Sequence, residues 1–173
     1  MTADPLRSIL ERCSCRAFRA DPVPQADIDR LIEVLRWAPS AGNRQPWRFL
    51  VIGSQGLRAR LAHAAFDQEF LAQAPIVFVV CVEPERSAVR YGERGRFLYA
   101  IQDTAAATEN LLIAATALGY GSCWVGAFDE NAVHEVLDIP EGLRVVAMVP
   151  VGVPAEPLAR RGRRPREETV EIR

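Results

Sequence analysis

Arg12, Ser14 and Arg16 place two guanidinium groups and a hydroxyl within five residues near the start of the chain. Such a group can hold an anion through charge-assisted hydrogen bonds. A solvated basic turn would look the same, so this segment alone leaves both interpretations open. Cys13 and Cys15 lie between these residues. Two thiols make a poor zinc site, and we interpret them as small residues beside the arginines.

A second polar segment runs from residue 38 to residue 49 and contains Pro39, Ser40, Asn43 and Gln45. Its amides and hydroxyl could read the edge of a planar polar heterocycle. Ordinary loop chemistry is the alternative, because Pro, Ser and Asn are common turn residues. A loop this dense in donors and acceptors nevertheless favours a binding site.

A third segment, residues 119–128, combines several glycines with an aromatic side chain. Trp124 offers a flat apolar wall, and glycines such as Gly126 let the backbone approach a ligand closely. A tryptophan in the core of a strand is the alternative interpretation. Late in the chain, Arg161 and Arg163 belong to an arginine-rich run from 160 to 166.

The usual catalytic and metal-binding signatures are absent from the sequence. All 21 basic residues are arginine, which excludes Schiff-base chemistry at a lysine. The two histidines, His63 and His134, stand apart from any nucleophile or metal-ligand motif, and we interpret them as solvated surface residues. We therefore expect no metal site and no catalytic side chain.

The composition is that of one ordinary globular domain, which we place at residues 1–173. A formal net charge of −1 gives no electrostatic reason to expect a nucleic-acid partner. No stretch reaches the roughly 20 apolar residues that span a bilayer, so we expect no membrane segment. Residues 1–5 do not begin a signal peptide, and four cysteines are too few for a disulfide framework. Both features predict a cytoplasmic protein.

Apolar periodicity predicts the elements that must position these segments. We expect helices after Pro5 and at about 24–37, 55–65, 99–118 and 130–137, and strands at 48–52, 76–82, 122–125 and 143–151. This order predicts an α+β or α/β fold around a central sheet, with the wholly apolar run at 76–82 as a buried strand. Four arginines between 86 and 96 predict a mobile, solvated basic stretch rather than a contact to a 2′-phosphate.

The helix at 99–118 is apolar nearly all round, which predicts that more protein covers it than one chain of this size supplies. The last stretch, 154–173, is basic and lacks an apolar period of its own. We therefore expect a homodimer in which this carboxyl-terminal arm packs on the partner subunit.

Taken together, these segments resemble the FMN-dependent nitroreductase family. The match consists of Arg-x-Ser-x-Arg-x-Phe, then Pro-Ser-x-x-Asn-x-Gln-Pro-Trp from Pro39 to Trp47, then Leu-Gly-x-Gly-x-Cys-Trp-x-Gly and a late Arg-x-Arg-x-Pro. Their order and spacing hold over nearly the whole chain, and the second motif is the most specific. The resemblance implies an α+β, nitroreductase-like fold: a central, mostly antiparallel sheet flanked by helices, in an intertwined homodimer.

The resemblance also implies roles for individual residues at the phosphate end of FMN. The phosphate and the ribityl chain would be held by Arg12, Cys13, Ser14, Arg161 and Arg163. Arg16 would lie near N1 and O2 of the flavin, where negative charge collects on reduction.

At the flavin ring, the resemblance implies that Ser40 and Asn43, with the adjacent Pro39, come from the second subunit. Gln45 would support that loop.

The other side of the ring, near N5, would be lined by Trp124, Val125 and Gly126, with the backbone of Gly126 supporting hydride transfer. Asp67 stands where the family usually has an asparagine. An ionised aspartate can only accept hydrogen bonds, so a contact to flavin N3–H would survive and a donated bond would not.

The implied activity is that of an FMN-dependent oxidoreductase using NADH or NADPH, with a nitroaromatic, a quinone or another electron-poor small molecule as acceptor. Both substrates would react in turn in the same slot. Flavin chemistry needs no catalytic histidine, lysine or metal. Three alternatives stay open: a relative that modifies a flavin or removes halogens, one that binds a deazaflavin, and a flavin-binding protein with little turnover.

Overall fold

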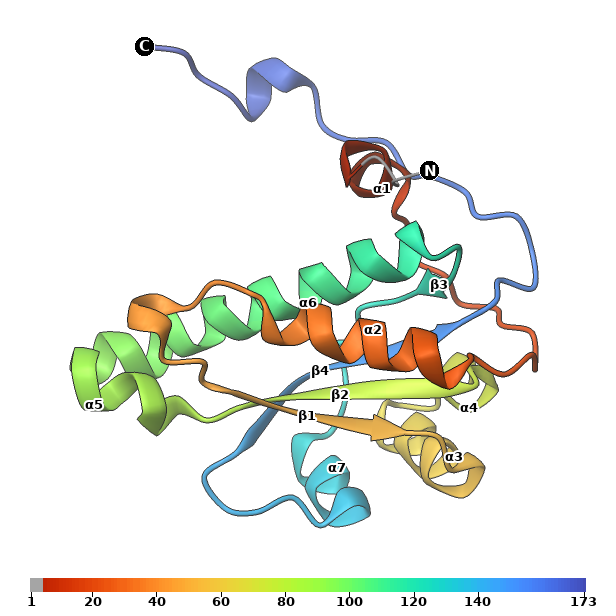
Figure 1. Cartoon of the computed structure of the whole chain (residues 1–173), viewed down its shortest axis with the longest axis horizontal. Coiled ribbons are helices and arrows are strands. Elements are labelled where there is room, and N and C mark those ends of the chain that lie inside the picture. Colours follow the sequence, from red (N-terminus) through yellow and green to blue (C-terminus); the bar gives the residue numbers. More distant parts are fainter. Residues whose placement is uncertain (1–4) are drawn as a thin grey trace.

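A four-stranded antiparallel sheet lies at the centre of the computed structural model, which describes residues 5–173 (Figure 1). Its order is β1-β2-β4-β3, with β1 at Trp47–Ile52, β2 at Ile76–Val82, β3 at Gly121–Ser122 and β4 at Arg144–Gly152. The expected α+β fold is confirmed. The expectation of no signal peptide rests mainly on residues 1–4, which lie outside the described residues.

Strand β2 occupies the middle of the sheet because every one of its side chains is apolar and can be buried on either face. All seven residues are buried. It pairs with β1 on one side, with Trp47 opposite Val82, and with β4 on the other, with Ile76 opposite Val151.

Helices cover both faces of this sheet (Figure 1). One face carries α2 (Gln25–Arg36) and α6 (Ala100–Ala117), and the other carries α3 (Gln55–Ala64), α4 (Phe70–Gln73) and α7 (Glu130–Leu137). Alternate residues of a strand face opposite ways, so β2 contributes to two cores. Accordingly, the core under α2 and α6 includes Ile76 and Phe78, Leu31, Leu111 and Val149, whereas the other core includes Val77 and Val79, Leu61, Val133 and Met148.

Helix α6 forms over nearly the expected range, and its inner face is fully buried at residues such as Leu111 and Ala115. Its other side remains half-buried in a single chain at Ile101, Ala105 and Ile113. The prediction that one chain does not completely cover this helix therefore agrees with the described surface.

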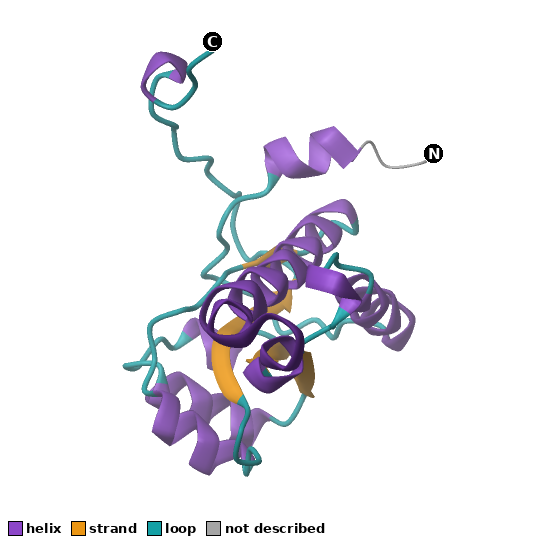
Figure 2. Ribbon diagram, turned by 90° about the vertical axis from the view of Figure 1, so that its left-hand side faces the viewer, coloured by secondary structure: helices purple, strands orange, loops and turns teal. Residues whose placement is uncertain are grey.

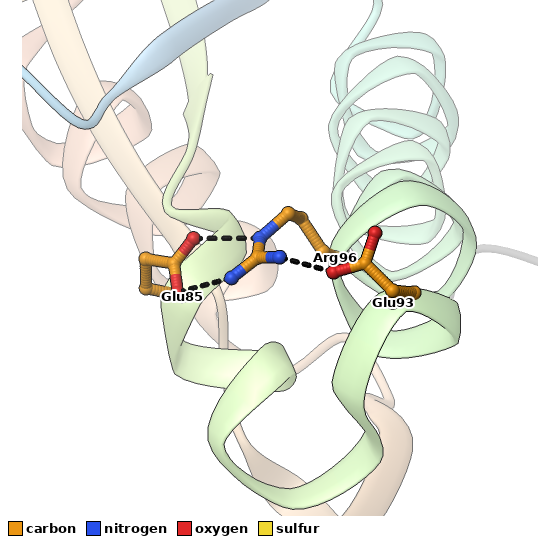
Figure 3. A network of polar contacts seen from close by, with 3 residues as sticks. All are labelled: Glu85, Glu93 and Arg96. Carbon is orange, nitrogen blue, oxygen red and sulfur yellow. Dashed lines mark hydrogen bonds and ion pairs between the residues drawn. The ribbon is translucent and has the colours of Figure 1, made fainter.

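The structure differs from two expectations about individual elements. The stretch with four arginines is helical: it forms α5 (Pro84–Arg94) and a π-helical turn, η2 (Gly95–Tyr99), which together we call the helical hairpin. Three of its arginines are exposed, as expected of a solvated stretch, and Arg96 pairs with Glu85 and Glu93 (Figure 3). The predicted strand at 122–125 is shorter, because only β3 pairs regularly and Val125 makes an isolated bridge to Met148. Helix α4 was not expected.

Both ends of the described chain project from the body, as Figures 1 and 2 show. Helix α1 (Pro5–Glu11) exposes Leu6 and Leu10, and the arm from residue 154 exposes Val170 and Ile172 around a short 3-10 turn, η3 (Arg166–Glu168). Both projecting ends of the described chain therefore expose apolar side chains.

Candidate functional site

A cavity of about 530 Å³ opens between the end of α1, the following segment, α6 and the arm. We call it the arginine cavity. Its wall is formed by Ile9, Leu10, Arg12, Cys13, Ser14, Arg16, Glu109, Ala159, Arg160, Arg161 and Arg163. Two groups of arginines that are about 150 positions apart in sequence therefore converge on one space.

Backbone pairing brings these groups together. The amide of Cys15 donates to the carbonyl of Ser122 at 2.8 Å, which attaches the segment after α1 to the edge of the sheet. The amide of Ala155 then donates to the carbonyl of Ala17 at 2.9 Å, which attaches the start of the arm to the same segment. The segment after α1 thus lies between β3 and the arm, and the arginines on both sides of it face one cavity.

The close approach at β3 depends on Gly121. A Cβ atom at this position would lie 2.6 Å from Cβ of Cys15, closer than side chains tolerate. Gly121 therefore lets the backbone of β3 approach the segment after α1. The sequence pattern had predicted that the glycines of residues 119–128 allow close approach to a ligand.

The charges in the arginine cavity are far from balanced. Arg12 Nε lies 3.3 Å from Glu109 Oε1, and Arg163 donates to the carbonyls of Arg161 and Gly162 at 3.1 and 3.2 Å. Among residues 5–173, no carboxylate forms an ion pair with Arg16, Arg160, Arg161 or Arg163. The cavity therefore holds several guanidinium groups whose donors remain available for an anion.

The thiols around the cavity differ in exposure. Cys13 is half-buried in the wall, whereas Cys15 and Cys123 are buried beneath it. Burial raises the pKa of the Cys123 thiol, and the nearby charge of Arg16 and a hydrogen bond with Ser14 oppose that rise. Burial likewise raises the pKa of Cys15. Both buried thiols are thus protonated at neutral pH and serve as packing residues.

The third segment lies directly beside the cavity. Ser122 pairs with Ser14, which is in the cavity wall, and the chain continues from there to Trp124. Val125 is fixed by reciprocal hydrogen bonds with Met148 at 2.9 and 3.0 Å. Trp124 is 39% exposed, and around Gly126 a Cβ would meet nothing nearer than the Trp124 indole nitrogen at 4.0 Å. Open space therefore adjoins both residues.

The second segment lies elsewhere. Residues 39–47, which we call the 39–47 loop, lie near the start of α6, beside α5 (Figure 1). Its turn η1 (Ala41–Asn43) is closed by Ser40 Oγ, which accepts from the amide of Gln45 at 3.0 Å, while Gln45 Nε2 donates to Asn43 Oδ1 at 3.1 Å. Within residues 5–173, no side chain of this loop lines the arginine cavity. A single chain does not bring the first and second segments together.

Asp67 is also separate from the cavity. It follows α3 with a φ of 58°, and its carboxylate lies 2.8 Å from His63 Nδ1. Its side chain is 71% exposed. The acceptor atoms of Asp67 thus already have one partner within the chain.

Five residues of the cavity wall were not predicted as site residues: Ile9, Leu10, Glu109, Ala159 and Arg160. Arg160 lies in the arginine run and could have been included on charge alone. Glu109 lies on α6, a helix rich in small and apolar residues, and Leu10 lies on the short helix α1; neither belongs to a motif that would predict a polar site. No group of His, Cys, Asp and Glu side chains suited to a metal ion occurs within residues 5–173. Over the same residues, no helix is both long and apolar enough to cross a membrane.

Comparisons with known proteins agree on one family. The model of the nitroreductase family matches residues 9–68 and 55–153. An Archaeoglobus fulgidus protein named "Putative NADH dehydrogenase/NAD(P)H nitroreductase" is 34% identical, over 87% of this chain and 86% of that protein. A 5,6-dimethylbenzimidazole synthase of Rhodobacter capsulatus is 32% identical, over 87% and 84%. The crystal structure of a nitroreductase family protein from Clostridium novyi NT superposes with a TM-score of 0.81 at 32% identity, covering 88% and 86%.

Proposed function

The chain belongs to the nitroreductase family, and on that basis we propose that it is an FMN-dependent NAD(P)H oxidoreductase that works as a homodimer. One observation carries the proposal: the arginine cavity gathers five guanidinium groups around a single carboxylate. An excess of fixed positive charge of this kind destabilises a folded protein unless an anion binds.

The donor set of the cavity fits the phosphate of FMN. A phosphate monoester carries close to two negative charges and three acceptor oxygens, and guanidinium forks match these oxygens in geometry. Arg12, Ser14, Arg161 and Arg163 would hold this phosphate, with Cys13 packed beside them. When bound, FMN supplies the hydride chemistry between a nicotinamide and an electron-poor acceptor.

The flavin ring would extend from the cavity towards the third segment. Arg16 lies between the two and would place its positive charge beside the ring. Trp124 and Val125 would form a wall, and the amide of Gly126 would face the ring in the open space described above. These residues position the ring and exclude water; none of them transfers a proton.

The homodimer follows from the distance between the segments. If both polar segments bind one flavin, Pro39, Ser40, Asn43 and Gln45 must come from a second copy, because in one chain they do not line the cavity. The half-covered side of α6 and the exposed apolar residues of α1 and the arm provide surface for that copy. Asp67 would accept a hydrogen bond from flavin N3–H either beside its contact with His63 or in place of that contact.

The test is to purify the protein, extract and identify its cofactor, and titrate it anaerobically with NADH and with NADPH. We expect yellow protein with FMN rather than FAD, and loss of the flavin absorbance on addition of at least one nicotinamide. A screen of nitroaromatics and quinones then identifies acceptors. Protein that binds no FMN would overturn the proposal. Protein that binds FMN but is not bleached would instead be a flavin-binding protein.

A second candidate has its own support. A relative named 5,6-dimethylbenzimidazole synthase is nearly as similar as the nitroreductase relative, at 32% against 34% identity. Sequence identity at this level therefore does not distinguish a reductase from a synthase. Assaying the purified protein with reduced flavin and oxygen for 5,6-dimethylbenzimidazole separates the two functions, since a reductase would yield none.

A further inference from the structure

We propose that Asp103 is a positioning residue for the 39–47 loop, and that it holds the loop in the conformation needed at the flavin. The inference rests on the proposed function, which makes this loop part of the flavin site of the second subunit. The hydrogen bond itself is a property of the chain alone, and so it can be tested without any activity.

Asp103 lies in the first turn of α6, and only 8% of its surface is exposed. Both of its carboxylate oxygens face the backbone amide of Ala41, at 3.1 and 3.2 Å. The two residues are 62 positions apart, so this contact ties the loop to the main helix of the fold. Because Asp103 accepts from a backbone amide, this contact fixes the path of the chain for any residue at position 41 that keeps its N–H.

The loop needs such an anchor because its backbone is strained. Gly42, Asn43 and Gln45 all have positive φ values, of 55°, 54° and 51°. For residues other than glycine this conformation costs energy, and it persists only where the surroundings determine it. Ala41, which Asp103 holds, directly precedes this run.

The opposite side of the loop is held by the helical hairpin through exposed groups. Arg44 Nε donates to the carbonyl of Arg86 at 2.7 Å, and Arg86 Nε donates to the carbonyl of Arg44 at 3.2 Å. A Cβ at Gly42 would collide with the hydroxyl of Tyr91. Asp103 provides the contact from the protein interior, so the loop is fixed between α6 and α5.

The anchor is costly, which argues that it serves more than stability. Burial raises the pKa of Asp103, and among residues 5–173 no cation forms an ion pair with its carboxylate. A buried carboxylate without a counterion is unfavourable compared with a well-packed apolar side chain. A residue that only filled space at the start of α6 would not need to carry this charge.

The first experiment measures hydrogen exchange at the amide of Ala41 in the full-length protein, without added flavin. We expect slow exchange in the wild type, slow exchange in Asp103→Asn, which keeps an acceptor, and much faster exchange in Asp103→Leu. Fast exchange in the wild type, or slow exchange in the leucine variant, would overturn the anchor.

The second experiment removes the same hydrogen bond from its other end. Ala41→Pro deletes only the donor, and Ser40, with φ −144° and ψ 151°, already has the conformation required before a proline. Residues that act through one hydrogen bond give non-additive effects in a double-mutant cycle. We expect Asp103→Leu and Ala41→Pro together to slow anaerobic bleaching of bound flavin no more than either change alone.

Each single change should lower the limiting bleaching rate by about tenfold to a hundredfold, the range expected for misplaced groups at a reacting centre. FMN affinity should change by less than about threefold, because the phosphate contacts remain. Asp103→Asn should keep most of the rate. As a matched control, Asp129→Ala removes another carboxylate that accepts from two backbone amides, those of Asn131 and Ala132, at the start of α7. It should lower stability and leave the rate unchanged.

The outcomes separate this inference from the proposed function. Wild-type protein without FMN or without bleaching would refute the function and leave the exchange result to decide on the anchor. Wild-type protein that is bleached, with Asp103→Leu and Ala41→Pro bleached at the same rate, would refute the positioning role alone. If Asp103→Leu does not fold, the proline variant and the asparagine variant give the same decision.

Discussion

Two regions of the molecule are rich in arginine, and they treat its charge in opposite ways. In the helical hairpin, Arg96 forms a bidentate pair with Glu85 at 2.7 and 2.8 Å and also contacts Glu93 (Figure 3). Arg94 donates to the Tyr99 hydroxyl at 2.9 Å. In the arginine cavity, five arginines share one carboxylate. The number of arginines is similar, but the hairpin pairs Arg86 and Arg96 with acids and sets Arg90 and Arg94 against tyrosine rings, whereas in the cavity only Arg12 has an acidic partner among the described residues.

The difference shows which charges are available for a ligand. The hairpin pairs Arg86 and Arg96 with acids at the surface, where ion pairs contribute little to stability and are screened by salt. An anion approaching Arg96 would have to displace two glutamates already in place. An anion approaching the cavity would meet donors without acceptors. The sequences already differ in their acids: three glutamates lie within residues 83–96, and none lies within residues 12–16 or 160–166.

Removing the arm should have the largest effect on this contrast. A chain that ends before Leu158 loses Arg160, Arg161 and Arg163, which are three of the five cavity arginines. With charge-assisted bonds worth about 1.5–3 kcal/mol each, FMN affinity should fall by at least about a hundredfold. Fluorescence titration with FMN measures this, and sedimentation should show a weaker dimer. A folded truncation that binds FMN as tightly as the full chain would place the phosphate site elsewhere.

Single substitutions should separate the two regions directly. Arg163→Ala or Arg12→Ala should weaken FMN binding by about 1.5–3 kcal/mol, because each removes a charge-assisted donor from the cavity. Arg96→Ala removes the same group from the hairpin and should leave FMN affinity unchanged. Equal losses in the two regions would show that bulk charge, and not the cavity, attracts the cofactor.

Removing the one acid in the cavity should sharpen the contrast. Glu109 lies 3.3 Å from Arg12 and competes with any anion for it. Both side chains are partly exposed, at 44% and 24%, so the pair is worth only about 0.2–1 kcal/mol. Glu109→Gln should therefore tighten FMN binding by up to about fivefold at low salt, with the gain shrinking as salt is added. Weaker binding in this variant would mean that Glu109 orients Arg12 rather than competing with the ligand.

The fold was largely predictable because its strands carry a clear signal. Residues 76–82 are apolar without interruption and became the fully buried centre of the sheet. The helical hairpin was not predicted, since α5 has three arginines and two glutamates in polar surroundings and lacks a continuous apolar face. Its polar side chains find partners only in the folded chain, at Glu85 and Glu93 for Arg96 and at the 39–47 loop for Arg86.

The site was predictable in parts but not as a whole. The order of the motifs predicted that Arg12 and Ser14 act with Arg161 and Arg163; all four line the arginine cavity, and their role at a phosphate stays a prediction. Glu109 and Asp103 could not be identified beforehand, because both are isolated acids on α6, a helix rich in small and apolar residues, and belong to no motif. Their roles depend on which loops the fold places beside α6, and that is a tertiary property.

The smallest expected effect concerns the buried carboxylate of Asp103, which has no ion-pair partner among residues 5–173. Burial raises its pKa above the ordinary value of 3.8, so the folded chain binds this proton more tightly than the unfolded chain does. Stability from this group is therefore greatest in acid and is lost as pH rises from about the unfolded pKa through the raised folded pKa. Asp103→Asn removes this loss while keeping an acceptor for the amide of Ala41. Urea unfolding should show the variant equal to or slightly more stable than the wild type at pH 7, with the advantage disappearing at lower pH. If the wild type is instead the more stable protein at pH 7, the carboxylate has a favourable partner in the dimer, and its charge is then as well matched as that of Arg96 in the helical hairpin.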